Sequence, residues 1–171
     1  MLSEKKSFAV SKPELIALLL YVQGATGKTG EGIVGKTRLM KLVFLLLKEM
    51  GLEENMTQEP SFEPYRYGPF DAEVYDALDA LEELGVIEEI PHRDMESGEE
   101  EMLEQYDAKT TFRLTEFGLS RVKDLARRVP KDVIERLVKA KIIYGKMPLM
   151  QLLHYVYSRY PEYARLSEAN I

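Results

Sequence analysis

The chain contains no cysteine, no tryptophan and only two histidines among its 171 residues. The absence of cysteine excludes disulfide bonds, thiolate zinc sites and a thiol nucleophile, and it suits a reducing compartment. His92 and His154 stand far apart, and neither has an Asp or Glu near it at metal-ligand spacing. We therefore expect no metal centre and interpret both histidines as structural or solvated.

Long apolar runs are also absent. The longest ones, Leu15 to Val22 and Leu42 to Leu47, are shorter than the roughly 20 residues that a membrane helix needs. The first residues are polar, and no apolar signal core follows them. We expect a cytoplasmic protein with no membrane contact. A hydrophobic content of 45% in a chain of this length is enough to bury the core of one domain.

The charges are divided unevenly along the chain. Segment 52–107 carries 19 acidic and 2 basic residues, which gives −17, whereas the remainder carries 10 acidic and 21 basic residues, which gives +11 and a total of −6. The acidic block repels phosphate and the basic remainder attracts it. This division fits ordinary solvated helix faces, and it also fits one face for nucleic acid and another for a basic partner.

The first half of the chain shows two helix patterns separated by a glycine-rich segment. Ser11 and Glu14 form a capping box, which predicts a helix over 13–23. Five glycines in 24–35 predict a mobile loop. The next helix, 37–50, is apolar on every face in its middle and is expected to be the central core helix, with Thr37 as its cap.

The middle of the chain resembles a helix followed by a hairpin. Segment 61–67 alternates aromatic and polar residues as a short edge strand does, and Gly68-Pro69 is expected to turn the chain. Asp71 can cap a helix over 71–84. Its apolar face should hold Val74, Tyr75, Leu78, Leu81 and Leu84.

Two strands are expected after this helix, one over 86–90 and one leading through Leu114, with 91–109 between them as a floppy wing tip. Helices are expected over 116–128, 131–144 and 149–160. We therefore predict an α+β protein that is mostly helical, with a winged-helix-like core, a small β-hairpin wing and a C-terminal helical extension. The winged-helix-like domain should span 1–128, and the extension, 129–171, should pack on the same core.

A winged-helix fold favours DNA binding, but the charges of the expected recognition helix oppose it. A helix that reads a groove supplies Arg, Lys, Asn or Gln to base edges. This helix has no Lys or Arg, and its carboxylates are Asp71, Glu73, Asp76, Asp79, Glu82 and Glu83. If DNA binds, the basic 113–146 segment is the place to contact phosphates. Its candidates are Arg113, Arg121, Lys123, Arg127, Arg128, Lys131, Arg136, Lys139 and Lys141.

The segment Gly30 to Thr37 satisfies the phosphate-loop pattern G-x-x-x-x-G-K-T. That mechanism needs a buried strand directly before the loop, at the end of a parallel sheet. Here a helix and more glycines precede it, and no later apolar strand ends in an Asp for the metal. We interpret the match as coincidence. No serine nucleophile elbow is present either, so neither enzyme activity, nor a cofactor, nor a small-molecule substrate is expected.

The tyrosine-rich end of the chain is the candidate partner interface. Tyrosine rings next to an arginine have the composition of an interaction hot spot, although the same rings can pack on the core with their hydroxyls at the surface. Homodimerisation through the terminal helices is a further interpretation. The interface candidates are Tyr155, Tyr157, Arg159, Tyr160 and Tyr163.

Two short motifs resemble a known family. The segments 39–44 (LMKLVF) and 62–70 (FEPYRYGPF), with Glu73-Val74-Tyr75 after them, are similar to the Lys-Leu helix and Gly-Pro turn of the Panacea antitoxin domain. The segments 81–87 and 112–118 resemble the wing of PadR-like winged-helix regulators. The resemblance implies a non-enzymatic, antitoxin-like module that binds a protein partner. The alternative is a winged-helix transcriptional regulator that binds DNA.

Overall fold

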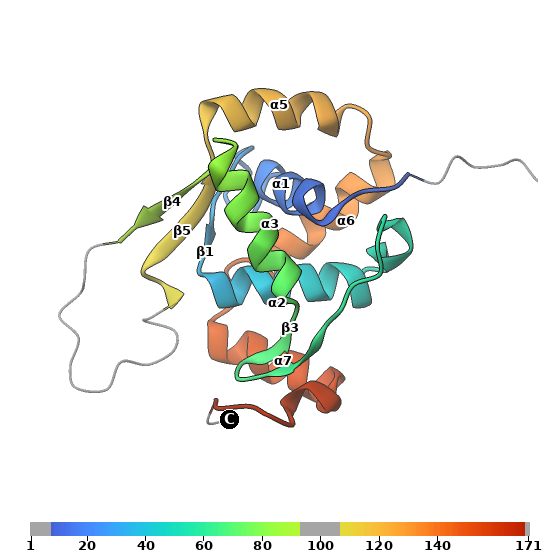
Figure 1. Ribbon diagram of the computed structural model, residues 1–171, viewed down its shortest axis with the longest axis vertical. Helices are drawn as coiled ribbons and strands as arrows, with labels where there is room; N and C mark the ends of the chain where they lie inside the picture. Colours follow the sequence, from blue (N-terminus) through green and yellow to red (C-terminus); the bar gives the residue numbers. More distant parts are fainter. Residues whose placement is uncertain (1–7, 93–106, 170–171) are drawn as a thin grey trace, which may run out of the picture.

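The computed structural model describes residues 8–92 and 107–169, and this part of the chain is a mostly helical α+β protein (Figure 1), which confirms the predicted fold class. Two short 3-10 turns, η1 (Leu52–Asn55) and η2 (Pro161–Ala164), follow the second and the last helix. The α-helices are α1 (Lys12–Tyr21), α2 (Lys36–Lys48), α3 (Ala72–Glu83), α5 (Glu116–Ala126), α6 (Lys131–Tyr144) and α7 (Leu149–Arg159).

A three-stranded antiparallel sheet forms the wing side of the molecule. Its strands are β1 (Ile33–Val34), β4 (Ile87–Pro91) and β5 (Thr110–Leu114), in the order β1-β5-β4. This order, in which a strand after the first helix joins a later hairpin, is that of a winged helix. The prediction of a loop throughout 24–35 was wrong at its end, where β1 pairs with β5. The expected wing tip falls largely in 93–106, outside the described residues.

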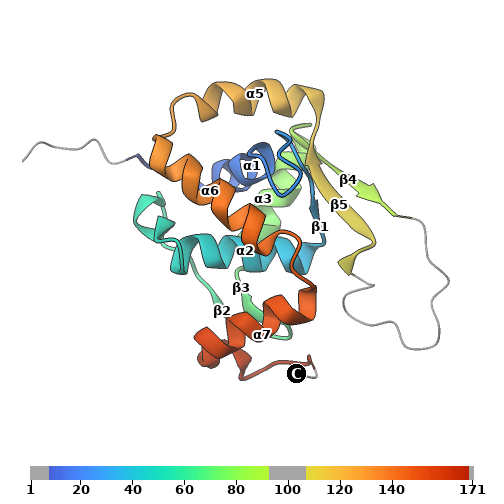
Figure 2. The ribbon, with the colours of Figure 1, turned by 180° about the vertical axis from the view of Figure 1, so that it is seen from behind.

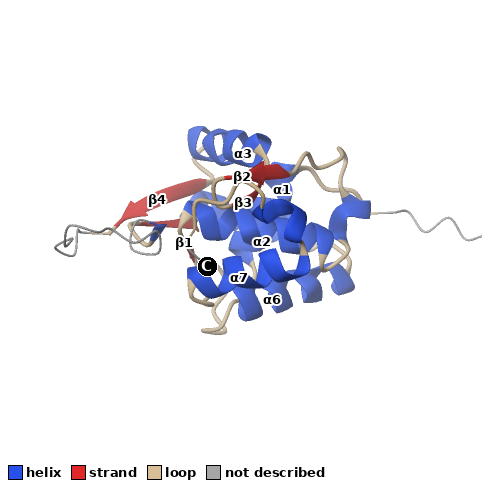
Figure 3. Ribbon diagram, turned by 90° about the horizontal axis from the view of Figure 1, so that it is seen from below, coloured by secondary structure: helices blue, strands red, loops and turns tan. Residues whose placement is uncertain are grey.

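The helices pack in three layers. Helices α1 and α2 lie between α3 on one side and α6 on the other (Figure 3), and the view from behind shows α6 in front of α2 (Figure 2). Segment 42–47 of α2 is buried on all faces, as its apolar sequence predicts. Val133 and Leu137 of α6 and Leu152 of α7 belong to the same hydrophobic cluster. Within the described residues, no helix is long and apolar enough to cross a bilayer.

A second hairpin separates α2 from α3. Strand β2 (Glu63–Tyr65) pairs with β3 (Gly68–Phe70), so the turn lies at residues 66–67 and not at Gly68-Pro69 as predicted. Gly68 has a φ of +88°, a left-handed conformation that favours glycine. In a helix-turn-helix unit, two helices are joined by a turn of about 3–4 residues. Here, residues 49–71 connect α2 to α3, so the connection is much longer than that turn.

Helix α3 has the expected amphipathic pattern. The Asp71 side chain caps it by accepting from the Glu73 amide at 3.0 Å. Five residues were predicted to form its apolar face, and Leu84 was one of them. Leu84 is instead 69% exposed. The prediction for Leu84 was wrong because the helix ends at Glu83, so its periodicity does not reach that residue. The buried positions are Val74, Ala77, Leu78 and Leu81.

Candidate functional site

The exposed side of α3 is acidic. We call the side chains of Asp76, Asp79 and Glu83 the acidic face; all three are exposed, and none forms an ion pair within the described part of the chain. Helix α3 contributes no cation to this surface. The acidic face therefore presents three exposed carboxylates to solvent.

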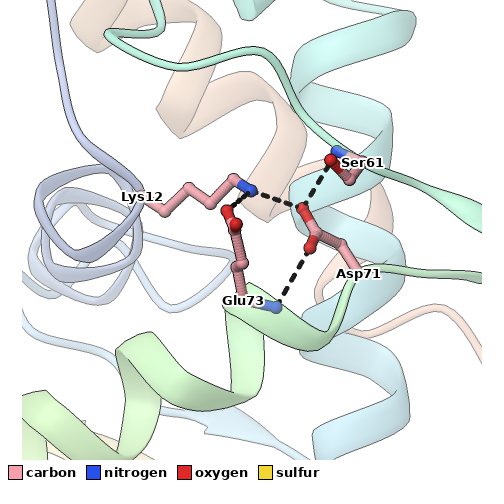
Figure 4. A network of polar contacts seen from close by, with 4 residues as sticks. All are labelled: Lys12, Ser61, Asp71 and Glu73. Atoms are coloured by element: carbon pink, nitrogen blue, oxygen red, sulfur yellow. Dashed lines mark hydrogen bonds and ion pairs between the residues drawn. The ribbon is translucent and has the colours of Figure 1, made fainter.

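Two of the six carboxylates predicted for this helix, Asp71 and Glu73, instead contact a lysine of the same chain. Asp71 is 2% exposed, and its carboxylate lies 2.7 Å from the ammonium of Lys12 at the start of α1 (Figure 4). Glu73 contacts the same ammonium, and the Ser61 amide donates to Asp71 at 3.3 Å. Burial by itself lowers the pKa of Lys12, but the bonds to Asp71 and Glu73 outweigh it and raise that pKa. This network joins α1 to α3.

Glu82 lies at the edge of the acidic face and is half-buried. Desolvation by burial, a hydrogen bond to Glu89 on β4 and the charge of Asp79 raise the pKa of Glu82 to about 7, although Lys36 acts in the opposite direction. Burial is the largest of these causes, and the neighbouring carboxylates Glu89 and Asp79 add to it.

The candidate nucleic-acid residues are distributed over α5, α6 and the wing. Arg113 pairs with Glu88 on the neighbouring strand at 2.7 Å, and Arg127 lies 3.7 Å from Asp124. Five of the candidates are exposed and form no ion pair within residues 8–92 and 107–169. These are Arg121, Lys123, Arg128, Lys131 and Lys139.

Lys141 does not belong on this surface. It is 3% exposed, and its ammonium donates to the carbonyls of Leu20 at 3.2 Å and Val22 at 2.7 Å, at the end of α1. Burial lowers the pKa of Lys141 to about 8. The prediction that Lys141 contacts phosphate was wrong. The sequence of a basic helix does not distinguish a lysine that points to solvent from one that donates to the carbonyls at the end of another helix. Arg136 is half-buried and pairs with Asp132 at 2.6 Å.

A shallow apolar groove runs along the outer side of α6. Its volume is about 460 Å³, and we call it the α6 groove. Two of its side chains, Ile142 and Ile143, are 47% and 43% exposed, which is unusual for isoleucine. The lining residues are Gln23, Lys131, Ile134, Glu135, Val138, Lys139, Ile142 and Ile143.

At the phosphate-loop motif, residues 30–37, a side chain of the protein itself occupies the N-terminus of the following helix. The carboxylate of Asp107 accepts from the amides of Thr37 at 2.8 Å and Arg38 at 3.1 Å, at the N-terminus of α2. A β-carbon added to Gly35 would fall on the Asp107 carboxylate. The place where a phosphate would bind therefore holds a carboxylate. This supports the interpretation that the match to the phosphate-loop pattern is a coincidence. It also corrects the prediction that Thr37 caps α2, because Gly35 is the first cap position and Asp107 supplies the acceptor.

The tyrosine-rich end is turned toward α2. Tyr155 and Tyr160 donate to the carboxylate of Glu49 at 2.8 and 2.6 Å, and Arg159 donates to it at 2.8 Å. Burial alone would raise the pKa of Glu49, but these three donors hold it below its ordinary value. Burial and the bond to Glu49 raise the pKa of Tyr160 to about 12.

The remaining tyrosines of this end also have partners within the chain. The ring of Tyr163 lies 5.0 Å from the ring of Phe44 in an edge contact, and Tyr157 donates to the Ser167 hydroxyl at 2.7 Å. Tyr160 meets the same Phe44 at 5.0 Å. Of the two interpretations given for this end, the structure shows the packing of the rings on the core. Arg159, which is 59% exposed, keeps most of its surface.

The two segments that carry the family resemblance touch each other. Lys41 of α2 is 2% exposed and donates to the carbonyl of Pro69 on β3 at 3.1 Å. A β-carbon on Gly68 would lie 3.2 Å from Lys41 and 3.1 Å from Tyr157. Burial lowers the pKa of Lys41 to about 7. These residues thus form the joint between the core helix and the second hairpin.

Sequence reasoning did not find Lys12, Lys41 and Asp107 as buried charges. A lysine in an apolar run was a usable signal for Lys41, since its neighbours left it no polar side. His92 contacts the Thr111 hydroxyl, and His154 is exposed. Among the described residues, no group of three or more His, Cys, Asp or Glu side chains could hold a metal ion.

No protein-family model matches the chain, and no curated protein matches it. The resemblance to the Panacea domain and to PadR-like wings therefore rests on the motif residues alone and stays a prediction.

Proposed function

We propose that this protein is a non-enzymatic, antitoxin-like regulatory module that binds a basic protein partner through the acidic face of α3. The observation that carries the proposal is the position of Asp76, Asp79 and Glu83. They are exposed, without an ion pair to any described residue, on the helix that a winged-helix fold presents to its ligand.

The electrostatics favour a cationic partner for two reasons. Like charges gathered on one helix raise each other's free energy, and next to the acidic face the charges of Glu89 and Asp79 add to burial in raising the pKa of Glu82. Arginines or lysines of a partner relieve this repulsion and also speed the encounter, because complementary potentials steer two proteins together. The winged-helix scaffold holds the carboxylates on one rigid helix.

A direct test is co-expression with the product of the neighbouring gene. We expect the two proteins to co-elute, and we expect toxicity of the neighbour, if present, to be relieved. The variant Asp76→Asn, Asp79→Asn, Glu83→Gln should weaken the complex at least tenfold and flatten its salt dependence. The control variant Glu116→Gln, Asp124→Asn, which removes exposed acids from α5, should leave it unchanged. A complex of equal affinity with all three proteins contradicts the proposal.

A second candidate function is DNA binding, which is favoured by the five exposed cations of α5, α6 and the connection between them that have no ion pair among the described residues. It is tested by gel shift of mixed-sequence duplex over a salt series. A phosphate binder weakens steeply as salt rises, and Lys123→Gln with Arg128→Gln should reduce the slope. Absence of a shift at low salt rejects this function.

A further inference from the structure

We infer that the α6 groove is an interface between two copies of this chain, related by a two-fold axis that passes near Val138. This goes beyond the proposed function, because α6 lies on the opposite side of the molecule from α3 (Figure 3). The two surfaces can therefore be tested separately.

The apolar floor of the groove has the spacing of a helix-packing ridge. Ile134, Val138 and Ile142 follow one another at intervals of four residues, and they stay half-buried or exposed while the opposite side of α6 fills the core. Two helices that interdigitate such ridges cross at about 50° with their axes about 8–10 Å apart. A second helix of this kind removes the three side chains from water.

The ridge is symmetric about its middle residue. In an antiparallel pair with Val138 at the crossing point, Val138 meets Val138 of the partner subunit. Ile134 then meets Ile142 of the partner subunit, and Ile142 meets the partner's Ile134. Each apolar side chain thus faces another apolar one, as a self-complementary two-fold interface requires.

The charges on the rim select a second copy over a uniformly charged helix. Three charged side chains line the groove, Lys131, Glu135 and Lys139; all are exposed, and none has an ion pair in the described residues. With Val138 at the crossing point, Glu135 and Lys139 of the partner subunit are offset by two residues, about 3 Å along the helix, and their long side chains span this offset. The pair of Lys139 with the partner's Glu135 is equivalent. A basic helix would meet Lys131 and Lys139 unfavourably, and an acidic helix would meet Glu135 unfavourably.

The dimer has a consequence for the proposed function. Since α3 and α6 lie on opposite sides of each copy, joining the α6 surfaces directs the two acidic faces outward. The assembly is then bivalent for a basic partner. It also removes Lys139 from the set of cations that could contact DNA.

The absence of cysteine allows a clean crosslinking test. Val138→Cys places one thiol at the proposed axis, where helix packing brings the two α-carbons within the range of a disulfide, about 4.4–6.8 Å. Under mild oxidation we expect most of this variant to form a disulfide-linked dimer. Asp79→Cys on α3 should not link. Ile142→Cys should link poorly to itself but well to Ile134→Cys when the two variants are mixed.

The ion pairs are tested by charge exchange, with the dissociation constant measured by sedimentation. Glu135→Lys or Lys139→Glu alone should raise the dimer dissociation constant about tenfold, because each creates two like-charge meetings. The double variant Glu135→Lys, Lys139→Glu should restore it, since both pairs re-form with reversed sign. Both residues are exposed, so loss of folding does not account for the result.

A chain that is monomeric at tens of micromolar, and whose Val138→Cys variant does not link, overturns the inference, and the groove then serves a foreign helix. Efficient linking of the Asp79→Cys variant, or a dimer that the double exchange fails to restore, overturns it too. Either result leaves the test of the acidic face intact, because that test uses other residues and another ligand.

Discussion

Asp107 caps helix α2 from seventy residues further along the chain than Thr37: its carboxylate accepts from the amides of Thr37 and Arg38 at 2.8 and 3.1 Å. Asp107 is the last residue of the acidic segment 52–107 and precedes β5, so this contact fixes the end of the wing to the start of the core helix. Free amides at a helix N-terminus are stabilised by an anion. Here the anion belongs to the protein.

Asp107→Ala should lower the free energy of unfolding by about 1–2 kcal/mol, because it removes the acceptor for two amides of α2. Asp107→Asn should cost less, since one oxygen remains to accept and the buried charge is gone. Urea denaturation at neutral pH measures both, with the exposed Asp124→Ala as control. An equal loss for alanine and asparagine contradicts the capping role.

Lys12→Met should be among the most destabilising single changes, because it leaves the buried carboxylate of Asp71 without its cation. Breaking a buried pair from one side costs about 3–5 kcal/mol. The double variant Lys12→Met, Asp71→Asn should recover part of this loss, and Lys48→Met on the surface should cost little. Additive losses in the double-mutant cycle would show that the two side chains do not interact.

Lys41 makes stability depend on pH in the alkaline range. Its pKa is about 7 in the folded protein and 10.5 in the unfolded chain, so between these values the unfolded state binds more protons. Stability should therefore rise with pH through this window. Lys41→Met should flatten the rise in the urea midpoint, whereas the exposed Lys123→Met on α5 should leave it unchanged. If the full rise in stability with pH persists in the Lys41→Met variant, groups other than Lys41 cause it.

Glu82 makes stability depend on pH in the opposite direction to Lys41. Its pKa rises from 4.5 to about 7 on folding, so the folded state binds the proton more tightly between these values. The stability that this group contributes is present below pH 4.5 and is lost as pH rises through about 7. Glu82→Gln should remove that decline, as seen by thermal melting over a pH series, while Glu53→Gln on η1 should not. A decline that is unchanged in Glu82→Gln refutes this assignment.

The helices were predictable because their signals are local. The capping box of Ser11 and Glu14, the apolar middle of α2 and the spacing of Val74, Leu78 and Leu81 all lie within a few residues of each other. The same local pattern predicted α6, whose bounds match the expected 131–144.

The missed features depend on distant parts of the chain. Strand β1 has two residues and forms only because β5 lies beside it, so no alternation exists to detect. The cap that Asp107 provides for α2 and the hydrogen bond from Lys141 to the end of α1 likewise join segments far apart in sequence. For the candidate site, the carboxylates of α3 were predictable, but the contacts of Asp71 and Glu73 with Lys12 were not, since either side of a helix start can be acidic.

The contacts of α2 with the end of the chain bear on how the protein folds during synthesis. Phe44 is covered by Tyr160 and Tyr163, and Glu49 receives donors from Tyr155, Arg159 and Tyr160. Helix α2 is synthesised more than a hundred residues before the side chains that donate to Glu49. The apolar surface of α2 therefore stays partly uncovered on the nascent chain until those residues emerge, and chaperones can bind it during this period.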